Sequence, residues 1–236
     1  IHYTHAVNCS FNSNTAYYGG AMYYGSAENC VFNSNTAKSY GGAMYYGSAE
    51  NCTFNSNTAN QGGAIYYGSA VNCSFKNNTA NYDGGAMYGD GYTATNCQFT
   101  NNTAKRNGGA TYQITANNCN FTENIAAENG GAMYMGVASN SNFTQNLANK
   151  DGGAVYDGLV ANCLFECNSA ENGGAMSRGR ATNCTFNNNN ATNYGGAAYD
   201  AKISNNSEFN NNIALNGSET DNVTWFNPEN SKSFFD

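Results

Sequence analysis

The sequence predicts an all-β fold, a parallel β-helix (solenoid) of about ten coils with 21–24 residues each. Two short motifs, F-x-x-N and G-G-A, alternate along nearly the whole chain at that spacing. Asparagine and glycine, which oppose helix formation, separate short apolar segments that are typical of strands. The phenylalanines that mark the ten copies are Phe11, Phe32, Phe54, Phe75, Phe99, Phe121, Phe143, Phe165, Phe186 and Phe209.

Equivalent residues of stacked coils form columns in which neighbours lie about 4.8 Å apart. We therefore expect the phenylalanines to form one buried column. The asparagine three residues after each phenylalanine is expected to join coil to coil through its amide, as an asparagine ladder. Its members are Asn14, Asn35, Asn57, Asn78, Asn102, Asn124, Asn146, Asn168, Asn189 and Asn212. A middle member such as Asn102 should contribute more to stability than Asn212, which has a full repeat coil on one side only.

The chain divides into one repeat domain, residues 1–214, and a C-terminal capping tail, residues 215–236. The last copy lacks G-G-A and passes into Trp225, Pro228, Phe234 and Phe235. An aromatic tail of this kind is predicted to cover the open edge of the last coil. The sequence starts within a coil, so we expect it to be a piece of a longer array.

Composition excludes several classes of function. Charged residues make up 11% of the chain, and the net charge is −7. The nine Lys and Arg residues are scattered, which is not the pattern of a nucleic-acid-binding protein. No run of 18 apolar residues is present, so no membrane-spanning helix is predicted.

A cysteine column precedes the phenylalanine column by two residues. The side chains share a strand face with phenylalanine, which predicts a row of small buried thiols. Disulfides between neighbouring coils are the alternative, because the column spacing lies within the Cα range of a disulfide. The column consists of Cys9, Cys30, Cys52, Cys73, Cys97, Cys119, Cys163 and Cys184, with Ser141 and Ser207 in the other two copies. Cys167 lies off the column.

Two tyrosine columns follow G-G-A. The first lies one residue after an apolar position that we expect to face inward, so alternation turns its tyrosines outward. It consists of Tyr23, Tyr45, Tyr66, Tyr88, Tyr112, Tyr134, Tyr156 and Tyr199. The second is the next residue along, Tyr24, Tyr46 and Tyr67. Both interpretations of this stripe stay open: a structural stack of rings, or a surface that contacts a glycan or a neighbouring chain. The predicted contact is strongest where both columns are present.

The second column becomes charged near the end of the chain, at Asp157, Arg178 and Asp200. Alternating signs on adjacent coils predict a surface ladder of ion pairs, each worth about 0.2–1 kcal/mol.

No catalytic site is predicted. β-helix enzymes that act on polysaccharides place acidic residues together on neighbouring coils. Here Glu28 and Glu50 share a column, but it continues as Val71, Thr95 and Asn117. The spacing of the cysteines is unlike that of metal sites. We therefore expect no enzyme activity, no cofactor and no metal.

The alternating F-x-x-N and G-G-A-[IMV] motifs resemble the repeats of chlamydial polymorphic outer-membrane proteins. They are also similar to those of adhesin-like surface proteins of methanogenic archaea. The resemblance covers about residues 6–214 and implies a right-handed, single-stranded parallel β-helix that serves as a passenger or stalk with variable ligands. The chain departs from this pattern by its high asparagine content, by its cysteine column and by showing no translocator or anchor.

Together these features predict a non-enzymatic, extracellular, adhesin-type protein of the cell surface. Recurrent N-x-[ST] sequons agree with a glycosylated surface protein. The expected partners are other cells, glycans or identical chains that assemble end to end or laterally, and not nucleic acid. The alternative is a structural subunit of an extracellular sheath, filament or surface layer.

Overall fold

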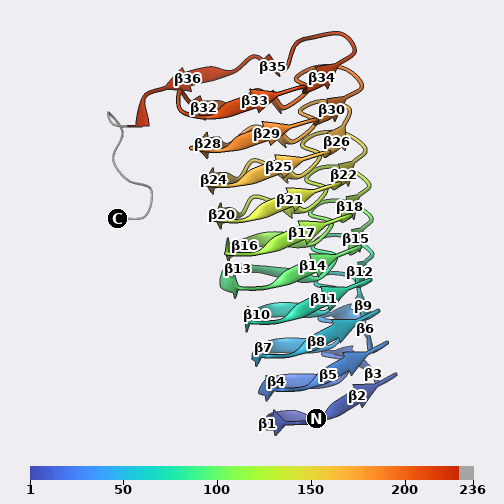
Figure 1. The fold of residues 1–236 in the computed structure, drawn as a ribbon. Helices are drawn as coiled ribbons and strands as arrows, with labels where there is room; N and C mark the ends of the chain where they lie inside the picture. Colours follow the sequence, from blue (N-terminus) through green and yellow to red (C-terminus); the bar gives the residue numbers. More distant parts are fainter. Residues whose placement is uncertain (229–236) are drawn as a thin grey trace.

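The computed structural model describes residues 1–228, which form a stack of coils in which every paired strand is parallel to its neighbour (Figure 1). Each coil adds strands to three sheets that run along the rod. Residues 1–228 contain no α-helix. The predicted all-β parallel solenoid is confirmed, while the right hand of its coil remains an expectation from the resemblance.

The bounds of the strands follow the repeat. The path of the first sheet is β1 (His2–Val7), β4 (Met22–Glu28), β7 (Met44–Glu50), β10 (Ile65–Val71), β13 (Met87–Thr95), β16 (Thr111–Asn117), β19 (Met133–Tyr134), β23 (Val155–Tyr156), β27 (Met176–Ser177), β31 (Ala198–Tyr199) and β35 (Thr220–Asp221). The same sheet includes β20 (Val137–Ser139), β24 (Leu159–Ala161), β28 (Arg180–Thr182), β32 (Lys202–Ser204) and β36 (Thr224–Phe226).

The other two sheets contain one short strand from each coil. The second sheet consists of β2 (Ser10–Asn12), β5 (Val31–Asn33), β8 (Thr53–Asn55), β11 (Ser74–Lys76), β14 (Gln98–Thr100), β17 (Asn120–Thr122), β21 (Asn142–Thr144), β25 (Leu164–Glu166), β29 (Thr185–Asn187) and β33 (Glu208–Asn210). The third consists of β3 (Thr15–Tyr18), β6 (Thr36–Tyr40), β9 (Thr58–Ala59), β12 (Thr79–Ala80), β15 (Thr103–Ala104), β18 (Ile125–Ala126), β22 (Leu147–Ala148), β26 (Ser169–Ala170), β30 (Asn190–Ala191) and β34 (Ile213–Ala214).

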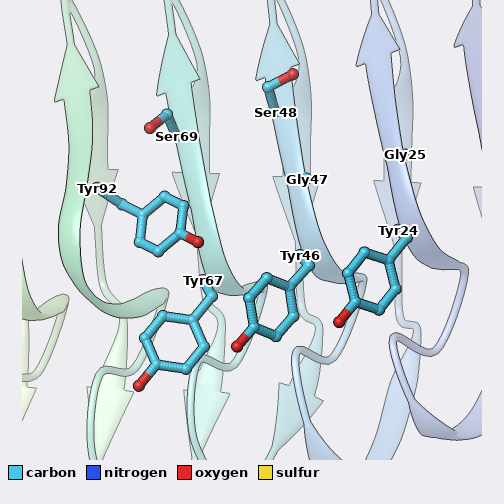
Figure 2. Close-up of a pocket in the computed structure, with 8 residues that line it drawn as sticks. All are labelled: Tyr24, Gly25, Tyr46, Gly47, Ser48, Tyr67, Ser69 and Tyr92. Atoms are coloured by element: carbon cyan, nitrogen blue, oxygen red, sulfur yellow. The ribbon is translucent and has the colours of Figure 1, made fainter.

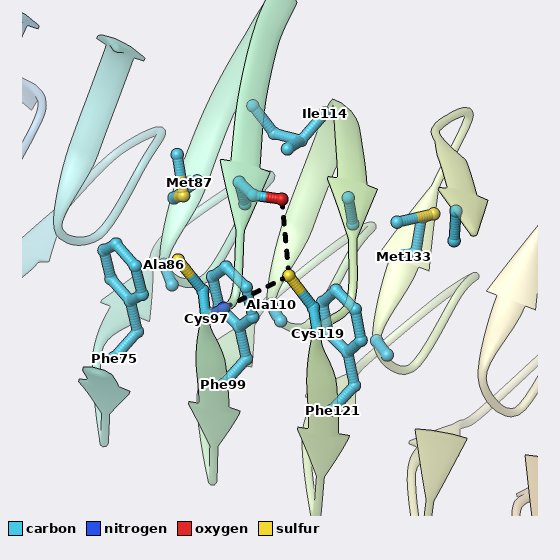
Figure 3. Close-up of a cluster of buried hydrophobic side chains, with 14 of the residues drawn as sticks. Phe75, Ala86, Met87, Cys97, Phe99, Ala110, Ile114, Cys119, Phe121 and Met133 are labelled. Atoms are coloured by element: carbon cyan, nitrogen blue, oxygen red, sulfur yellow. Dashed lines mark hydrogen bonds between the residues drawn. The ribbon is translucent and has the colours of Figure 1, made fainter. Parts of the chain in front are cut away.

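The phenylalanine column is the centre of the core. Eight of its members, Phe32 through Phe186, are fully buried. Neighbouring rings stack with centroids 4.7–4.9 Å apart and planes within 3–11° of parallel. Phe11 and Phe209 are only partly buried, because each has a phenylalanine on one side only. Figure 3 shows Phe75, Phe99 and Phe121 beside the buried Met87 and Met133, whose inward position the alternation predicts.

The cysteine column is a hydrogen-bonded row of thiols. The Sγ of Cys52 accepts the backbone N–H of Cys30 at 3.4 Å and donates to the carbonyl of Glu50 at 3.1 Å. Ser141 does the same with its hydroxyl, at 3.1 Å from the N–H of Cys119 and 2.8 Å from the carbonyl of Ser139. The position therefore needs a small side chain that both donates and accepts, which explains why only cysteine and serine occupy it.

All nine cysteines are free thiols in the structure. Seven members of the column are buried, whereas Cys9 in the first coil and the off-column Cys167 are exposed. Burial raises the pKa of Cys184 well above its ordinary value, which disfavours the reactive thiolate.

A thiol count is expected to give two reactive groups in the native protein, Cys9 and Cys167, and nine after denaturation without reductant. Titration with a thiol reagent measures both numbers, and Cys167→Ser should lower each by one. Fewer than nine thiols in the denatured wild type would mean that disulfides join neighbouring coils.

The asparagine ladder is present, and each inner member satisfies buried groups of two neighbouring coils. The Oδ1 of Asn102 accepts the backbone N–H and the Nδ2 of Asn78, both at 3.0 Å. Its Nδ2 donates to the carbonyl of Phe75 and to the Oδ1 of Asn124, also at 3.0 Å. The asparagine side chain thus joins three levels of the stack.

The two ends of the ladder differ from the expectation. Asn212 was expected to have one ladder neighbour and no more, but Glu219 replaces the missing coil. The Oε1 of Glu219 accepts the backbone N–H of Asn212 at 2.8 Å and its Nδ2 at 3.3 Å, and Asn212 is buried. The weakly held member is Asn14, which is exposed and donates only to the Oδ1 of Asn35.

Residues 215–228 add to the stack rather than leaving it. β35 pairs with β31 and β36 with β32, so the first sheet continues into the tail, which crosses the red end of the rod in Figure 1. The Trp225 ring lies edge-on to Phe209, with centroids 5.6 Å apart. Phe234 and Phe235 lie outside the described residues, and the division into residues 1–214 and a capping tail of residues 215–236 stays a prediction.

Candidate binding surface

The second tyrosine column occupies a corner with left-handed backbone. Tyr24, Tyr46 and Tyr67 have φ angles of 50°, 51° and 54°. This conformation costs an ordinary residue roughly 1–2 kcal/mol, and glycine or asparagine usually supplies it. The chain itself places asparagine at another left-handed corner of most coils, for example Asn29 and Asn51. Three consecutive coils therefore hold a bulky ring where the backbone favours a different residue.

These three tyrosines line an open groove of about 410 Å³ (Figure 2). The remaining lining residues are Gly25, Gly47, Ser48, Ser69 and Tyr92. The Tyr24 and Tyr46 rings are 5.0 Å apart with planes 6° from parallel, and Tyr67 follows at 5.1 Å with a 37° tilt. Parallel rings in direct contact are separated by about 3.5–4.0 Å, the usual distance between carbon atoms in contact. The centroids here are farther apart, so neighbouring rings are displaced sideways and part of each face stays uncovered. We name this feature the tyrosine groove.

Glycine at the base of the tyrosine groove is required by the packing of the rod, since an added Cβ atom on Gly25 or Gly47 would lie 3.0 Å from the Cε of the buried Met22 or Met44. A Cβ atom on Gly25 would overlap the carbonyl oxygen of Thr4, and one on Gly47 would overlap that of Gly25. No larger residue fits without moving the neighbouring coil. The Y-Y-G-S-A segment of the first coils thus produces a wall of rings, a floor of glycine and a far side of serine hydroxyls.

Tyr92 ends the row of rings. It follows Gly89 and Gly91 in the longest coil, where the pairing of β13 shifts register against both neighbours. Its ring lies 5.6 Å from Tyr67 and is turned by 45°. A side chain on Gly89 would meet the Tyr67 and Tyr92 rings at 2.7 and 3.0 Å, so glycine lets the two tyrosines close over this point.

The first tyrosine column is packed against its own members instead of lining the groove. Tyr23, Tyr45, Tyr66 and Tyr88 stack with centroids 5.1–5.5 Å apart, and Tyr66 is only 9% exposed. The pKa of Tyr45 is raised to about 12, mainly by burial and to a smaller extent by repulsion from neighbouring tyrosines. Burial and a nearby tyrosine likewise raise the pKa of Tyr88 to about 12. Of the predicted contact residues, the structure brings together Tyr24, Tyr46 and Tyr67 and places the other four in this stack.

Two tyrosines of the surface were missed by the sequence reasoning. Tyr3 continues the second column one coil earlier, 5.2 Å from Tyr24, and is exposed. Counting one coil back from Tyr24 would have found it. Tyr92 had no such signal, since it belongs to the insertion that breaks the repeat.

The predicted ion-pair ladder forms in part. Arg178 Nε lies 3.6 Å from Asp200 Oδ2. The guanidinium of Arg178 also lies over the Tyr156 ring, with its Cζ 5.5 Å from the ring centroid. Residues 1–228 contain no ion pair between Arg178 and Asp157.

Titratable side chains are sparse near the groove. Glu28 and Glu50 are register partners, and Val71 continues their column as expected. His5 Nδ1 lies 2.7 Å from Ser26 Oγ at an exposed edge.

Within the described part of the chain, no group of three or more His, Cys, Asp or Glu residues is placed to hold a metal ion. The same part contains no helix that is long and apolar enough to cross a membrane.

The fold and its columns define a parallel β-solenoid repeat protein with an aromatic groove on its first sheet. Five of its segments match the Chlamydia polymorphic membrane protein repeat, which confirms the resemblance predicted to that family. The matched residues are 51–68, 72–89, 96–113, 140–157 and 183–200.

Other comparisons add little beyond the repeat. No curated protein matches the chain. A tailspike protein mutant of E. coli bacteriophage HK620 in complex with a pentasaccharide is 13% identical with a TM-score of 0.40, over 92% of this chain. The chain spans about half of that protein, 53% of its length. The mannuronan C-5 epimerase AlgE4 A-module of Azotobacter vinelandii is 13% identical with a TM-score of 0.39, over 93% of this chain and 77% of the module.

Proposed function

We propose that this chain is a non-enzymatic, adhesin-type protein of the cell surface that attaches through the tyrosine groove. The observation that carries the proposal is the second tyrosine column, Tyr24, Tyr46 and Tyr67, held in left-handed corners beside an open groove. The same left-handed corner recurs at Gln113, Met135, Asp157, Arg178 and Asp200, so the corner belongs to the solenoid, and the tyrosine rings distinguish the coils beside the groove.

The stability of the rod has other sources. The buried phenylalanine column and the asparagine ladder run through the coils where the second column has Asp157 or Arg178 instead of tyrosine. Replacing a tyrosine of this column by asparagine exchanges a strained corner for a relaxed one. A rigid tyrosine ring with a polar tip also loses little side-chain entropy on binding, which suits recognition.

A surface location is supported by the five segments that match the repeat of a membrane protein family. A non-enzymatic role is supported by the lining of the groove, which consists of tyrosine, glycine and serine and contains no carboxylate, histidine or cysteine. The partners proposed are glycans or proteins of other cells.

The triple variant Tyr24→Asn, Tyr46→Asn, Tyr67→Asn is expected to lose attachment and to keep its fold. Asparagine tolerates the left-handed corner that these residues occupy. Because each substitution creates an N-G-S sequon, all proteins are produced in a host without N-glycosylation. Beads coated with the wild type or the variant are counted on a panel of cells and immobilised polysaccharides, and the variant should fall to the level of uncoated beads. Tyr82→Ser, which removes an exposed tyrosine that does not line the groove, is the control and should attach like the wild type.

Undiminished attachment of the triple variant would overturn the proposal. Light scattering on the same samples tests the alternative of a sheath or filament subunit. Ordered polymers formed by the wild type and lost in the triple variant would assign the groove to assembly and not to attachment.

A further inference from the structure

We infer that the tyrosine groove binds an uncharged, unbranched glycan chain that runs along the axis of the rod. The inference rests on the proposed function and names its ligand. Three features of the described residues carry it: the spacing of the rings, the hydroxyls opposite them, and the charges at the border of the groove.

The rings repeat once for each coil. Tyr24, Tyr46 and Tyr67 are spaced by 5.0 and 5.1 Å, which is close to the length of one pyranose unit in an extended glycan chain. Figure 2 shows the three rings in a row, one on each of three adjacent coils. Sugar rings present apolar C–H faces that pack against aromatic faces of this kind, so successive units of a chain can each meet a tyrosine.

Hydroxyl groups lie on the other side of the groove. Ser48 and Ser69 line the groove on neighbouring coils. Ser26 is their register partner on β4, and its Oγ lies 2.7 Å from the Nδ1 of His5. A hydroxyl both donates and accepts hydrogen bonds, as does the hydroxyl of a sugar. An aromatic wall with a few polar groups opposite is the usual composition of a small-molecule site.

The charges near the groove exclude an acidic ligand. Glu28 and Glu50 lie two residues beyond Ser26 and Ser48, so they project from the same face of the sheet. Asp90, two residues before Tyr92, is exposed at the closed end. No lysine or arginine lines the groove. A uronic acid chain would therefore meet the repulsion of these carboxylates within a Debye length and no lysine or arginine in the lining, whereas an uncharged chain meets no such repulsion.

The groove also has a direction. Tyr92 is turned across the row at one end, while Tyr3 extends the row beyond Tyr24 at the other. A linear chain can therefore enter from the Tyr3 side and end against Tyr92, and a branch that points into the groove would meet its lining at Gly25 and Gly47.

Calorimetry with linear hexasaccharides tests the inference. The probes are the neutral hexamers of glucose, mannose and galactose, and hexagalacturonate as the acidic hexamer of matched length. At least one neutral hexamer should bind, and hexagalacturonate should bind at least about tenfold more weakly at low salt. Tyr46→Asn should weaken the neutral complex by roughly tenfold, a typical effect of removing one anchoring ring. Tyr82→Ser should bind like the wild type.

The double variant Glu28→Gln, Glu50→Gln isolates the charge effect. It should leave the neutral affinity unchanged and raise the affinity for hexagalacturonate. Equal or tighter binding of hexagalacturonate to the wild type, or no binding of any neutral hexamer, would overturn the inference. If no hexamer binds while cell attachment still depends on Tyr24, Tyr46 and Tyr67, the glycan is wrong and the attachment role stands. If attachment does not depend on these tyrosines, the proposed function itself fails.

Discussion

Replacing Gly109 by alanine is expected to destroy the stacking of the middle coils. A Cβ atom at this position would overlap the carbonyl oxygen of Gly131 and lie 2.6 Å from the carbonyl carbon of Ile125. Both obstacles are backbone, so no side chain can rotate away and the neighbouring coil must move. Effects of this kind exceed about 4 kcal/mol, which is a large fraction of the stability of an ordinary domain.

Gly91→Ala is the matched control for this prediction. Gly91 lies in the insertion that precedes Tyr92, with a φ of 78° and no atom within 4 Å of an added Cβ. Its substitution should cost only the strain of the left-handed backbone, roughly 1–2 kcal/mol. Thermal unfolding followed by circular dichroism compares the two variants. A Gly109→Ala protein that melts as high as Gly91→Ala would contradict the packing of the G-G-A turns.

The second large effect is expected from Asn102→Ala. The substitution removes the partner of three buried groups: the backbone N–H of Asn78, one of its two Nδ2 hydrogens, and the carbonyl of Phe75. Each unsatisfied group costs about 1–3 kcal/mol, so the free energy of unfolding should fall by at least about 3 kcal/mol. For a chain of this size, the melting temperature should fall by roughly 6–12 °C.

Asn14→Ala is the control for the asparagine ladder. Asn14 is exposed, and its side chain makes one hydrogen bond, to the Oδ1 of Asn35. The loss should lower the free energy of unfolding by about 1 kcal/mol. Chemical denaturation of both variants measures the difference, and equal losses would mean that the hydrogen bonds between the coils do not stabilise the rod.

Asn212→Ala should lower the free energy of unfolding about as much as Asn102→Ala. Glu219 accepts the hydrogen bonds of Asn212 that the asparagine of a further coil would otherwise accept.

The repeat made most of the fold predictable, because a period of 21–24 residues fixes the register of every coil. Phe99, for example, must lie between Phe75 and Phe121 once the strands are parallel and the period is known. By the same period, Asn102 lies in the asparagine ladder and Cys97 in the cysteine column. Periodicity failed where the chain leaves it: Glu219 follows the last full copy, and Tyr92 lies in an insertion, so neither had a column to reveal its neighbours.

The candidate site was predictable only in part, for a different reason. Alternation along a strand turns both Tyr23 and Tyr45 outward, but it does not describe how a bent corner covers them. The left-handed corner at Tyr24 and Tyr46 is shared by later coils, at Met135 and Asp157 for example, so the groove beside the second column is formed by the rings that lie there. A sequence period carries no information about φ, so the distinction between packed and accessible tyrosines required the structure.

The central claim is that Tyr24, Tyr46 and Tyr67 serve contact and not the stability of the rod. Its most direct test is a paired measurement of melting temperature and attachment on the triple variant that replaces each of them with asparagine. The substitutions remove nine ring contacts of these partly exposed tyrosines, each worth about 0.5 kcal/mol at such a site. Relief of strain, roughly 1–2 kcal/mol per residue, should offset this loss. We predict a melting temperature close to that of the wild type together with attachment at background level. A melting temperature that falls as far as in Asn102→Ala, with attachment retained by the molecules that remain folded, would contradict the claim.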